Sequence, residues 1–288
     1  MIDLTAIYDA IGRLVPLDCM RMRFMQQAML ALVMLVPMCA AMGVQVVNFR
    51  MAFFSDAISH SAFAGVAIGL ILSADQRLAM AGFAVLVGLG IVAAGRRSSL
   101  SIDAIIGVFF SASIAFGLAV VSRNPSVARD VQRFLYGDIL TIGDADVLLL
   151  AGLLVALAAF QVVGYNRLLY VGLSQALAAA HRVRVRVYQY VFAMLLSLVV
   201  IFSVWAVGVL LVTAMLIVPA AAARNFARSA RGMFWWAIAV SLTSAVAGLL
   251  ISAQSWARTA TGATVVLCAT AWFAVSAVPA AFKRRGAR

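Results

Sequence analysis

The sequence predicts an all-α polytopic membrane protein with about nine transmembrane helices. Of its 288 residues, 65% are hydrophobic and 11% are charged, with a mean hydropathy of +1.07, whereas a soluble domain is roughly 45–50% apolar. The charged residues are clustered, and most of the intervals between them reach the length of about 20 apolar residues that a spanning helix needs. The apolar runs are also continuous, whereas the strands of membrane barrels alternate in polarity over about ten residues. Helices are therefore favoured over a barrel.

The expected helices follow the uncharged intervals in order. Residues 1–23 form a membrane-surface or short helical lead, and residues 24–288 form a single transmembrane domain. We expect spans at residues 25–47, 53–73, 78–95, 102–122, 145–164, two short ones within 187–221, then 232–253 and 262–281. Arginines flank the interval 187–223 on both sides, so the chain has to enter and return there. A turn near Ser203 to Gly208 is predicted.

Two segments are too polar to span. Residues 123–146 form the longest polar connection, on the predicted outer side. Residues 165–186 form a cytoplasmic segment whose alanine and leucine content favours a helix and whose end is rich in arginine. We interpret it as a surface for a partner, with an ordinary interfacial helix as the alternative.

The basic residues indicate an orientation. With the arginine clusters near residues 182–186, 224–231 and 283–288 inside, 14 basic residues lie inside and eight outside, and the N-terminus lies outside. Short basic patches between spans do not favour nucleic-acid binding, despite the net charge of +12. Charged residues interrupt the apolar core that a cleavable signal peptide needs, so the first span is expected to direct membrane targeting. The cysteines Cys19, Cys39 and Cys268 have no paired spacing and are interpreted as packing residues.

One apolar segment carries a carboxylate and an imidazole. Asp56 and His60 are four residues apart in FFSDAISHSAFAGVAIGL, so on a helix they share a face. Charged groups at membrane depth are costly and usually mark a pathway. This ligand pair suits divalent ions such as zinc, manganese or iron, and a weak site suits translocation. A hydrogen-bonded packing pair, or Asp56 as an interfacial helix cap, is the structural alternative.

A second face of the same segment is lined by small side chains: Ala57, Ser61, Gly65 and Gly69. This spacing lets helices approach closely in lipid, although small residues are also common in membrane helices. The chain contains no glutamate and one lysine, Lys283. A Walker A sequence needs a lysine between a glycine and a serine or threonine, and Lys283 does not have these neighbours. We therefore expect no nucleotide hydrolysis by that route, and His181 is expected to be solvated and not catalytic.

Four segments resemble the membrane permeases of the zinc, manganese and chelated-iron ABC importers, the ABC-3 type metal permeases. They are RMAFFSDAISHSAFAGVAIG at 50–69, IDAIIGVFFSASIAFGL at 102–118, FLYGDILTI at 134–142 and VGVLLVTAMLIVPAAAARNFARS at 207–229. The first contains an Asp-Ala-x-Ser-His run followed by a small-residue helix. The matches occur in family order over most of residues 24–281.

The resemblance implies a type II ABC-importer-like bundle in the bacterial inner membrane. It implies a homodimer, separate cytoplasmic ATPase subunits, and an extracytoplasmic metal-binding protein. Asp56 and His60 match the helix residues that meet the metal in transit. Zinc is the first expected cargo, manganese the second and iron a further candidate, with no permanently bound cofactor.

The segment 165–186 matches the position where the family presents its coupling helix to the ATPase. Where family members usually have acidic residues and a glycine, this chain carries Ser174, Gln175, His181, Arg182 and Arg184. We therefore expect a dedicated ATPase with a complementary acidic groove. On the residues alone, two other functions remain open. One is a proton-coupled secondary transporter that uses Asp56 and His60 as a relay, and the other is a structural membrane subunit in which the pair only joins two helices.

Overall fold

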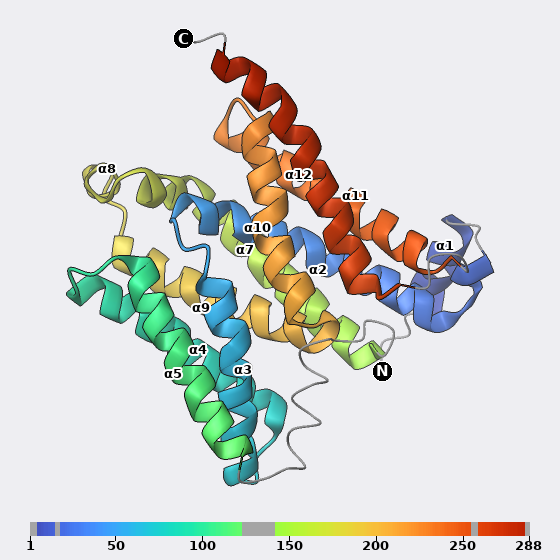
Figure 1. Ribbon diagram of the computed structural model, residues 1–288, viewed down its shortest axis with the longest axis horizontal. Coiled ribbons are helices and arrows are strands. Elements are labelled where there is room, and N and C mark those ends of the chain that lie inside the picture. Colours follow the sequence, from blue (N-terminus) through green and yellow to red (C-terminus); the bar gives the residue numbers. More distant parts are fainter. Residues whose placement is uncertain (1–4, 15–17, 123–141, 255–258, 286–288) are drawn as a thin grey trace.

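The computed structural model describes residues 5–14, 18–122, 142–254 and 259–285, and every regular element in these ranges is a helix (Figure 1). A short lead holds α1 (Thr5–Leu14) and the 3-10 turn η1 (Asp18–Arg21). The bundle then contains α2 (Arg23–Asn48), α3 (Phe54–Ile71), α4 (Gln76–Arg97), α5 (Ile102–Val121), α7 (Asp144–Leu173), α8 (Gln175–Ala180), α9 (Val185–Val207), α10 (Val209–Phe226), α11 (Ala230–Ser252) and α12 (Thr261–Arg285).

Eight helices of the described ranges are long and apolar enough to cross a membrane. They are α2, α4, α5, α7, α9, α10, α11 and α12. The 18-residue α3 is not in that set, but it packs against both α4 and α5. The prediction of an all-α polytopic protein is therefore confirmed, and the expected count of about nine spans is close.

Helix α2 lies at the centre of the bundle. It packs against α7, α9, α10 and α11, and most of its side chains are buried. Its crossing with α10 is close, because a Cβ added at Gly43 would lie 1.8 Å from the carbonyl oxygen of Leu216. Only a glycine permits this approach of the two backbones, which is how helices associate in lipid.

The predicted turn between the two spans within 187–221 is confirmed. Helix α9 ends at Val207 and α10 begins at Val209, with Gly208 between them at φ 86° and ψ 164°. This conformation is open almost only to glycine, because a side chain there would clash with the backbone. Each of the two helices is longer than expected, with 23 and 18 residues.

The helix that contains the expected span 145–164 extends beyond residue 164. Helix α7 continues without a break to Leu173, over 30 residues. Leu157, Gln161, Leu168 and Val171 are buried on one face of this helix, so its packing stripe passes through the expected boundary. The segment 165–186 therefore consists of the last part of α7, the short α8, and the start of α9. Residues 123–141, which make up most of the polar connection 123–146, lie outside the described residues.

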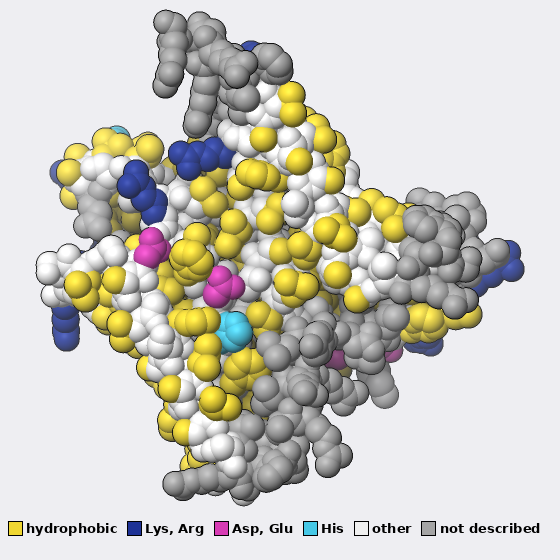
Figure 2. All heavy atoms as spheres, in the orientation of Figure 1, with side chains coloured by type: hydrophobic (Ala, Val, Ile, Leu, Met, Phe, Trp, Pro, Cys, Tyr) yellow, Lys and Arg dark blue, Asp and Glu magenta, His cyan; other side chains and the backbone are white. Residues whose placement is uncertain are grey.

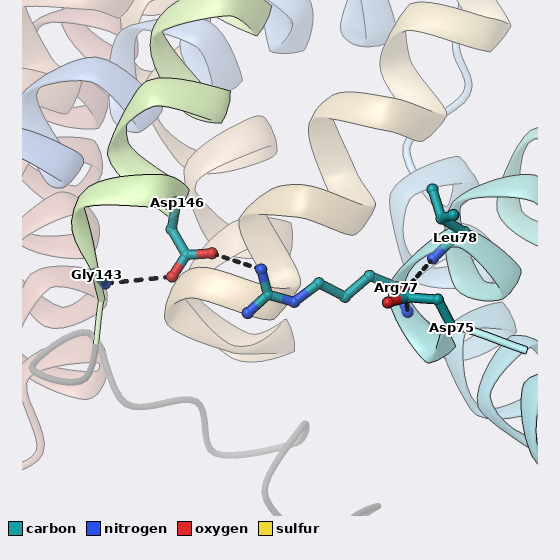
Figure 3. A network of polar contacts seen from close by, with 5 residues as sticks. All are labelled: Asp75, Arg77, Leu78, Gly143 and Asp146. Carbon is teal, nitrogen blue, oxygen red and sulfur yellow. Dashed lines mark hydrogen bonds and ion pairs between the residues drawn. The ribbon is translucent and has the colours of Figure 1, made fainter. Parts of the chain in front are cut away.

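Ion pairs join helices at the end of the bundle where α2, α4 and α7 begin. A guanidinium nitrogen of Arg77 in α4 donates to Asp146 of α7 at 2.9 Å, and the second oxygen of Asp146 accepts from the backbone N–H of Gly143 (Figure 3). Asp75 caps α4 by accepting from the backbone N–H groups of Arg77 and Leu78. The starts of α4 and α7 are thereby tied together.

Candidate functional site: the polar pair of α3

The polar pair of α3 lies near the start of that helix. Asp56 is in the first turn, where the positive end of the helix dipole favours a carboxylate, and His60 follows one turn later. Both side chains are half-buried. Figure 2 shows a histidine and an acidic side chain close together at the surface over α3, surrounded by hydrophobic side chains. The pair therefore lies on a face that is mostly apolar.

Aromatic rings hold the imidazole of His60. It meets Phe110 of α5 edge to face, with ring centroids 5.1 Å apart, and Phe63 at 5.6 Å. Its Nδ1 atom is buried and has no hydrogen-bond partner among the described residues. The ring is thus oriented by packing, and no described residue uses its Nδ1 atom.

No hydrogen bond or ion pair to the Asp56 carboxylate occurs within the described part of the chain, and none joins it to His60. It also accepts no bond from the backbone at the helix start, so it does not act as a cap. A half-buried carboxylate without a cation carries an electrostatic cost. A bound cation would offset that cost.

The small-residue face of α3 is buried. Ala57, Ser61, Gly65 and Gly69 all lie inside the bundle. A Cβ added at Gly65 would lie 2.6 Å from the Cα of Met80, and one at Gly69 would lie 3.1 Å from the Cβ of Ala79. The backbone of α3 is therefore held against α4.

The described residues contain no group of three or more His, Cys, Asp or Glu side chains that could hold a metal ion. One copy of the chain thus offers at most two such ligands at α3. Zinc usually has four ligands in proteins, and a catalytic or transient site leaves some positions open. A site built from one chain is consequently weak and open.

The predicted coupling residues lie on other elements. Ser174 ends α7 and caps α8, with its hydroxyl accepting from the N–H of Leu177. His181 stacks on Tyr170 of α7 with ring centroids 4.5 Å apart, and Arg182 has a positive φ of 54°. His181, Arg182 and Arg184 are exposed. Gln175 is the first residue of α8.

The sequence interpretation missed a cavity of about 470 Å³ between the last turns of α2, α4 and α7 and the first turns of α5 and α9. Arg50 and Arg96 line it. From the sequence, both arginines count only among the 14 basic residues expected inside. A pattern of charges along a chain does not reveal that residues about 46 positions apart face one space.

The eight long apolar helices define a multi-pass membrane protein. Residues 21–280 match the model of the ABC 3 transport family, and the chain belongs to that family. The resemblance found in four sequence segments is thereby confirmed.

Individual relatives support the same assignment. The chain is 32% identical over 250 residues to the "High-affinity zinc uptake system membrane protein ZnuB" of Haemophilus influenzae, covering 86% of this chain and 95% of that protein. It is 30% identical over 253 residues to the "Manganese import system permease protein ScaB" of Streptococcus gordonii, covering 88% and 90%. The solved structure "PsaBC from Streptococcus pneumoniae in complex with Fab" is similar with a TM-score of 0.77 and 28% identity, covering 94% of this chain and 95% of that one.

Proposed function

We propose that this chain is the permease subunit of an ATP-driven importer that moves a divalent transition metal, zinc first and manganese second, across the bacterial plasma membrane. The observation that carries the proposal is the pair Asp56 and His60, half-buried on an apolar face without a hydrogen bond to each other. Imidazole nitrogen with carboxylate oxygen suits both ions, and iron is a further candidate. Family membership and relatives named for zinc and manganese support this assignment.

A second copy of the chain completes the proposed site. Because one chain offers two ligands, a two-fold axis beside α3 would bring two aspartates and two histidines together. Helix α5, which packs beside α3, exposes a face with small residues: Ala104, Gly107, Ser111 and Ala115. Nothing lies within 4 Å of a Cβ added at Gly107. Such a face permits close approach of another helix.

The exposed segment around α8 is the proposed contact for separate ATPase subunits. Its exposed cations, with Arg182 and Arg184 among them, favour an acidic groove on that partner. The chain itself lacks a Walker A sequence, so we place ATP hydrolysis on the partner. An extracytoplasmic metal-binding protein would deliver the ion at the opposite end of the bundle.

Transport by reconstituted vesicles tests the site. The permease is reconstituted with its ATPase and binding protein, and uptake of zinc and of manganese is measured with ATP inside the compartment that corresponds to the cytoplasm. Asp56→Asn and His60→Gln keep the side-chain size but remove the charge or the imidazole ligand. We expect each to lower uptake by at least tenfold, because removing one of two ligands per copy opens the site.

Asp9→Asn is the matched control, since Asp9 is an exposed carboxylate of the lead helix α1. It should leave uptake at the level of the unmodified protein. Normal uptake by both α3 variants, with intact assembly, would remove Asp56 and His60 from the pathway. Uptake driven by a pH gradient without ATP or ATPase would instead favour the proton-coupled transporter.

A further inference from the structure

We propose that the cavity lined by Arg50 and Arg96 binds the phosphate group of an anionic phospholipid from the cytoplasmic leaflet. The cavity measures about 470 Å³ and lies where α2, α4 and α7 end and α5 and α9 begin. The proposal rests on the orientation that places this arginine-rich end inside. It concerns a different place from the Asp56 and His60 pair, neither of which lines the cavity.

Two cations from different parts of the chain, the turn after α2 and the end of α4, line this cavity. Arg96 in the last turn of α4 donates through Nη1 to Oε1 of Gln189 in α9, at 2.7 Å. This bond holds the guanidinium in place and leaves its other N–H groups available. Arg50 is exposed and forms no ion pair within the described residues. A phosphate oxygen could accept from both guanidinium groups.

Several of the residues that line the cavity are apolar and buried. Met51, Val171 and Phe192 are buried lining residues, with exposed fractions of 8%, 5% and 2%, whereas both arginines are exposed. The lining therefore combines exposed cations with buried apolar groups. A phospholipid has this same division between a charged headgroup and apolar chains. Basic pockets between transmembrane helices on the cytoplasmic side bind such headgroups.

An acidic peptide of a partner is the alternative occupant, since the amides of Asn48 and Gln189 also line the cavity. Asp103 directly follows the lining residue Ile102 in the sequence, and its side chain is exposed. It forms no ion pair with Arg50 or Arg96. The cationic character of the cavity is therefore not neutralised from within the described residues.

The backbone at Arg50 lies in the left-handed region. Arg50 has a φ of 56°, just after α2 ends, and the N–H of Met51 donates back to the carbonyl of Val46 at 3.0 Å. This is the helix-ending turn in which glycine is usual at the left-handed position. An arginine there is conformationally strained, and such strain is often retained at functional positions. Ser73 and Arg182 adopt the same conformation after α3 and α8, so binding is inferred from the cavity and not from this turn.

Native mass spectrometry of the purified full-length permease tests the proposal. The protein is exchanged into detergent containing either phosphatidylglycerol or phosphatidylcholine, and retained lipid is counted. We expect preferential retention of phosphatidylglycerol. Arg50→Gly and Arg96→Gln should each lower that retention by about fivefold, the contribution of one cation near an anionic headgroup. Arg97→Gln is the matched control, because Arg97 is exposed beside Arg96 but does not line the cavity, and should leave retention unchanged.

Arg50→Gly removes backbone strain, so its thermal midpoint should equal or exceed that of the unmodified protein, which separates lost binding from lost folding. Arg50→Lys should keep most of the retention.

Equal retention of both lipids, or retention unaffected by either cavity variant, would overturn the proposal. So would displacement of the lipid by millimolar inorganic phosphate at constant ionic strength, which would indicate a site for free phosphate. Normal lipid retention by Arg50→Gly with weakened ATPase assembly would indicate a protein-docking surface. Metal uptake through Asp56 and His60 is measured separately, so failure of one proposal leaves the other standing.

Discussion

At the scale of single residues, Tyr8 connects the lead helix to the bundle. Its side chain is 2% exposed, and its hydroxyl donates to Oδ1 of Asp144 at 2.8 Å. Gln27 donates to the same oxygen at 2.9 Å, and the guanidinium of Arg23 lies 5.5 Å above the Tyr8 ring. Asp144 begins α7, so the phenol ties α1 to a helix more than 130 residues later. The lead is therefore held in place by named contacts.

This contact should give the protein a specific sensitivity to alkali. Burial, and then the hydrogen bond and charge of Asp144, raise the pKa of Tyr8 to about 12, from 10.0 for a free phenol. A raised pKa means that the neutral phenol stabilises the fold fully below pH about 10, and that this contribution is lost as the pH rises towards 12. Tyr8→Phe should cost about 1 kcal/mol at neutral pH and should lose less stability between pH 10 and 12.

Thermal unfolding of both proteins in detergent, from pH 8 to 12, measures the difference. Tyr190→Phe is a suitable control, because Tyr190 is half-buried in α9. This variant should lose as much thermal stability between pH 10 and 12 as the unmodified protein. If Tyr8→Phe loses as much stability at high pH as the unmodified protein, ionisation of Tyr8 is not the cause of that loss.

At the scale of elements, the packing of α3 on α4 should depend on Gly65. An alanine Cβ there would lie 2.6 Å from the Cα of Met80, a distance that real contacts do not show. Gly65→Ala must therefore push α3 away from α4, at a cost of about 1–3 kcal/mol. Because α3 carries Asp56 and His60, uptake should fall as well.

The chain offers a control for this substitution in the neighbouring helix. Gly82 of α4 has nothing within 4 Å of an added Cβ. Gly82→Ala should therefore be neutral or stabilise by up to about 1 kcal/mol, because alanine favours helix. Thermal midpoints and uptake rates of the two variants provide the comparison. Equal midpoints would mean that the two helices are not held together at Gly65.

The elements also show what sequence reasoning can and cannot reach. The break at Gly208 was predictable, because flanking arginines required two crossings and a glycine stood near the centre of the interval. The extent of α7 was not, because Tyr165 and Arg167 suggested an end where buried Leu168 and Val171 continue the helix. A polar residue can lie on the exposed side of a helix that continues, and only the packing partners decide this.

The candidate site also has features that the sequence predicts and features that it does not. The shared face of Asp56 and His60 followed from their spacing of four residues, because that spacing is a property of any helix. The edge-to-face contact of His60 with Phe110 could not be predicted, because it requires knowing that α5 packs beside α3. The cavity at Arg50 and Arg96 depends on five chain segments meeting, which no local pattern specifies.

At the scale of the whole molecule, charge is distributed unequally between the two ends of the bundle. The eight basic residues assigned outside are matched by eight of the ten aspartates, all but Asp56 and Asp103. In this expected orientation the outer side would carry no net formal charge, and the inner side, with Asp56 and Asp103 counted there, would carry the net +12. Some of the outer charges pair directly, since Arg77 meets Asp146 and Arg23 lies 3.6 Å from Asp144. Such pairing leaves the inner clusters to set the orientation.

Cysteine labelling tests this orientation. In a chain whose three cysteines are replaced by alanine, single cysteines are introduced at exposed positions: Ala74→Cys between α3 and α4, Ala180→Cys at the end of α8, and Ala230→Cys at the start of α11. A membrane-impermeant maleimide is then added to right-side-out and to inside-out vesicles. We expect the cysteine at 74 to react only in right-side-out vesicles, and those at 180 and 230 only in inside-out ones. The reason is that an odd number of crossings separates residue 74 from the inner arginine clusters. Labelling of all three from one side would mean that an even number of crossings separates residue 74 from residue 180, and exchange of the two patterns would mean that the arginine-rich end faces outward.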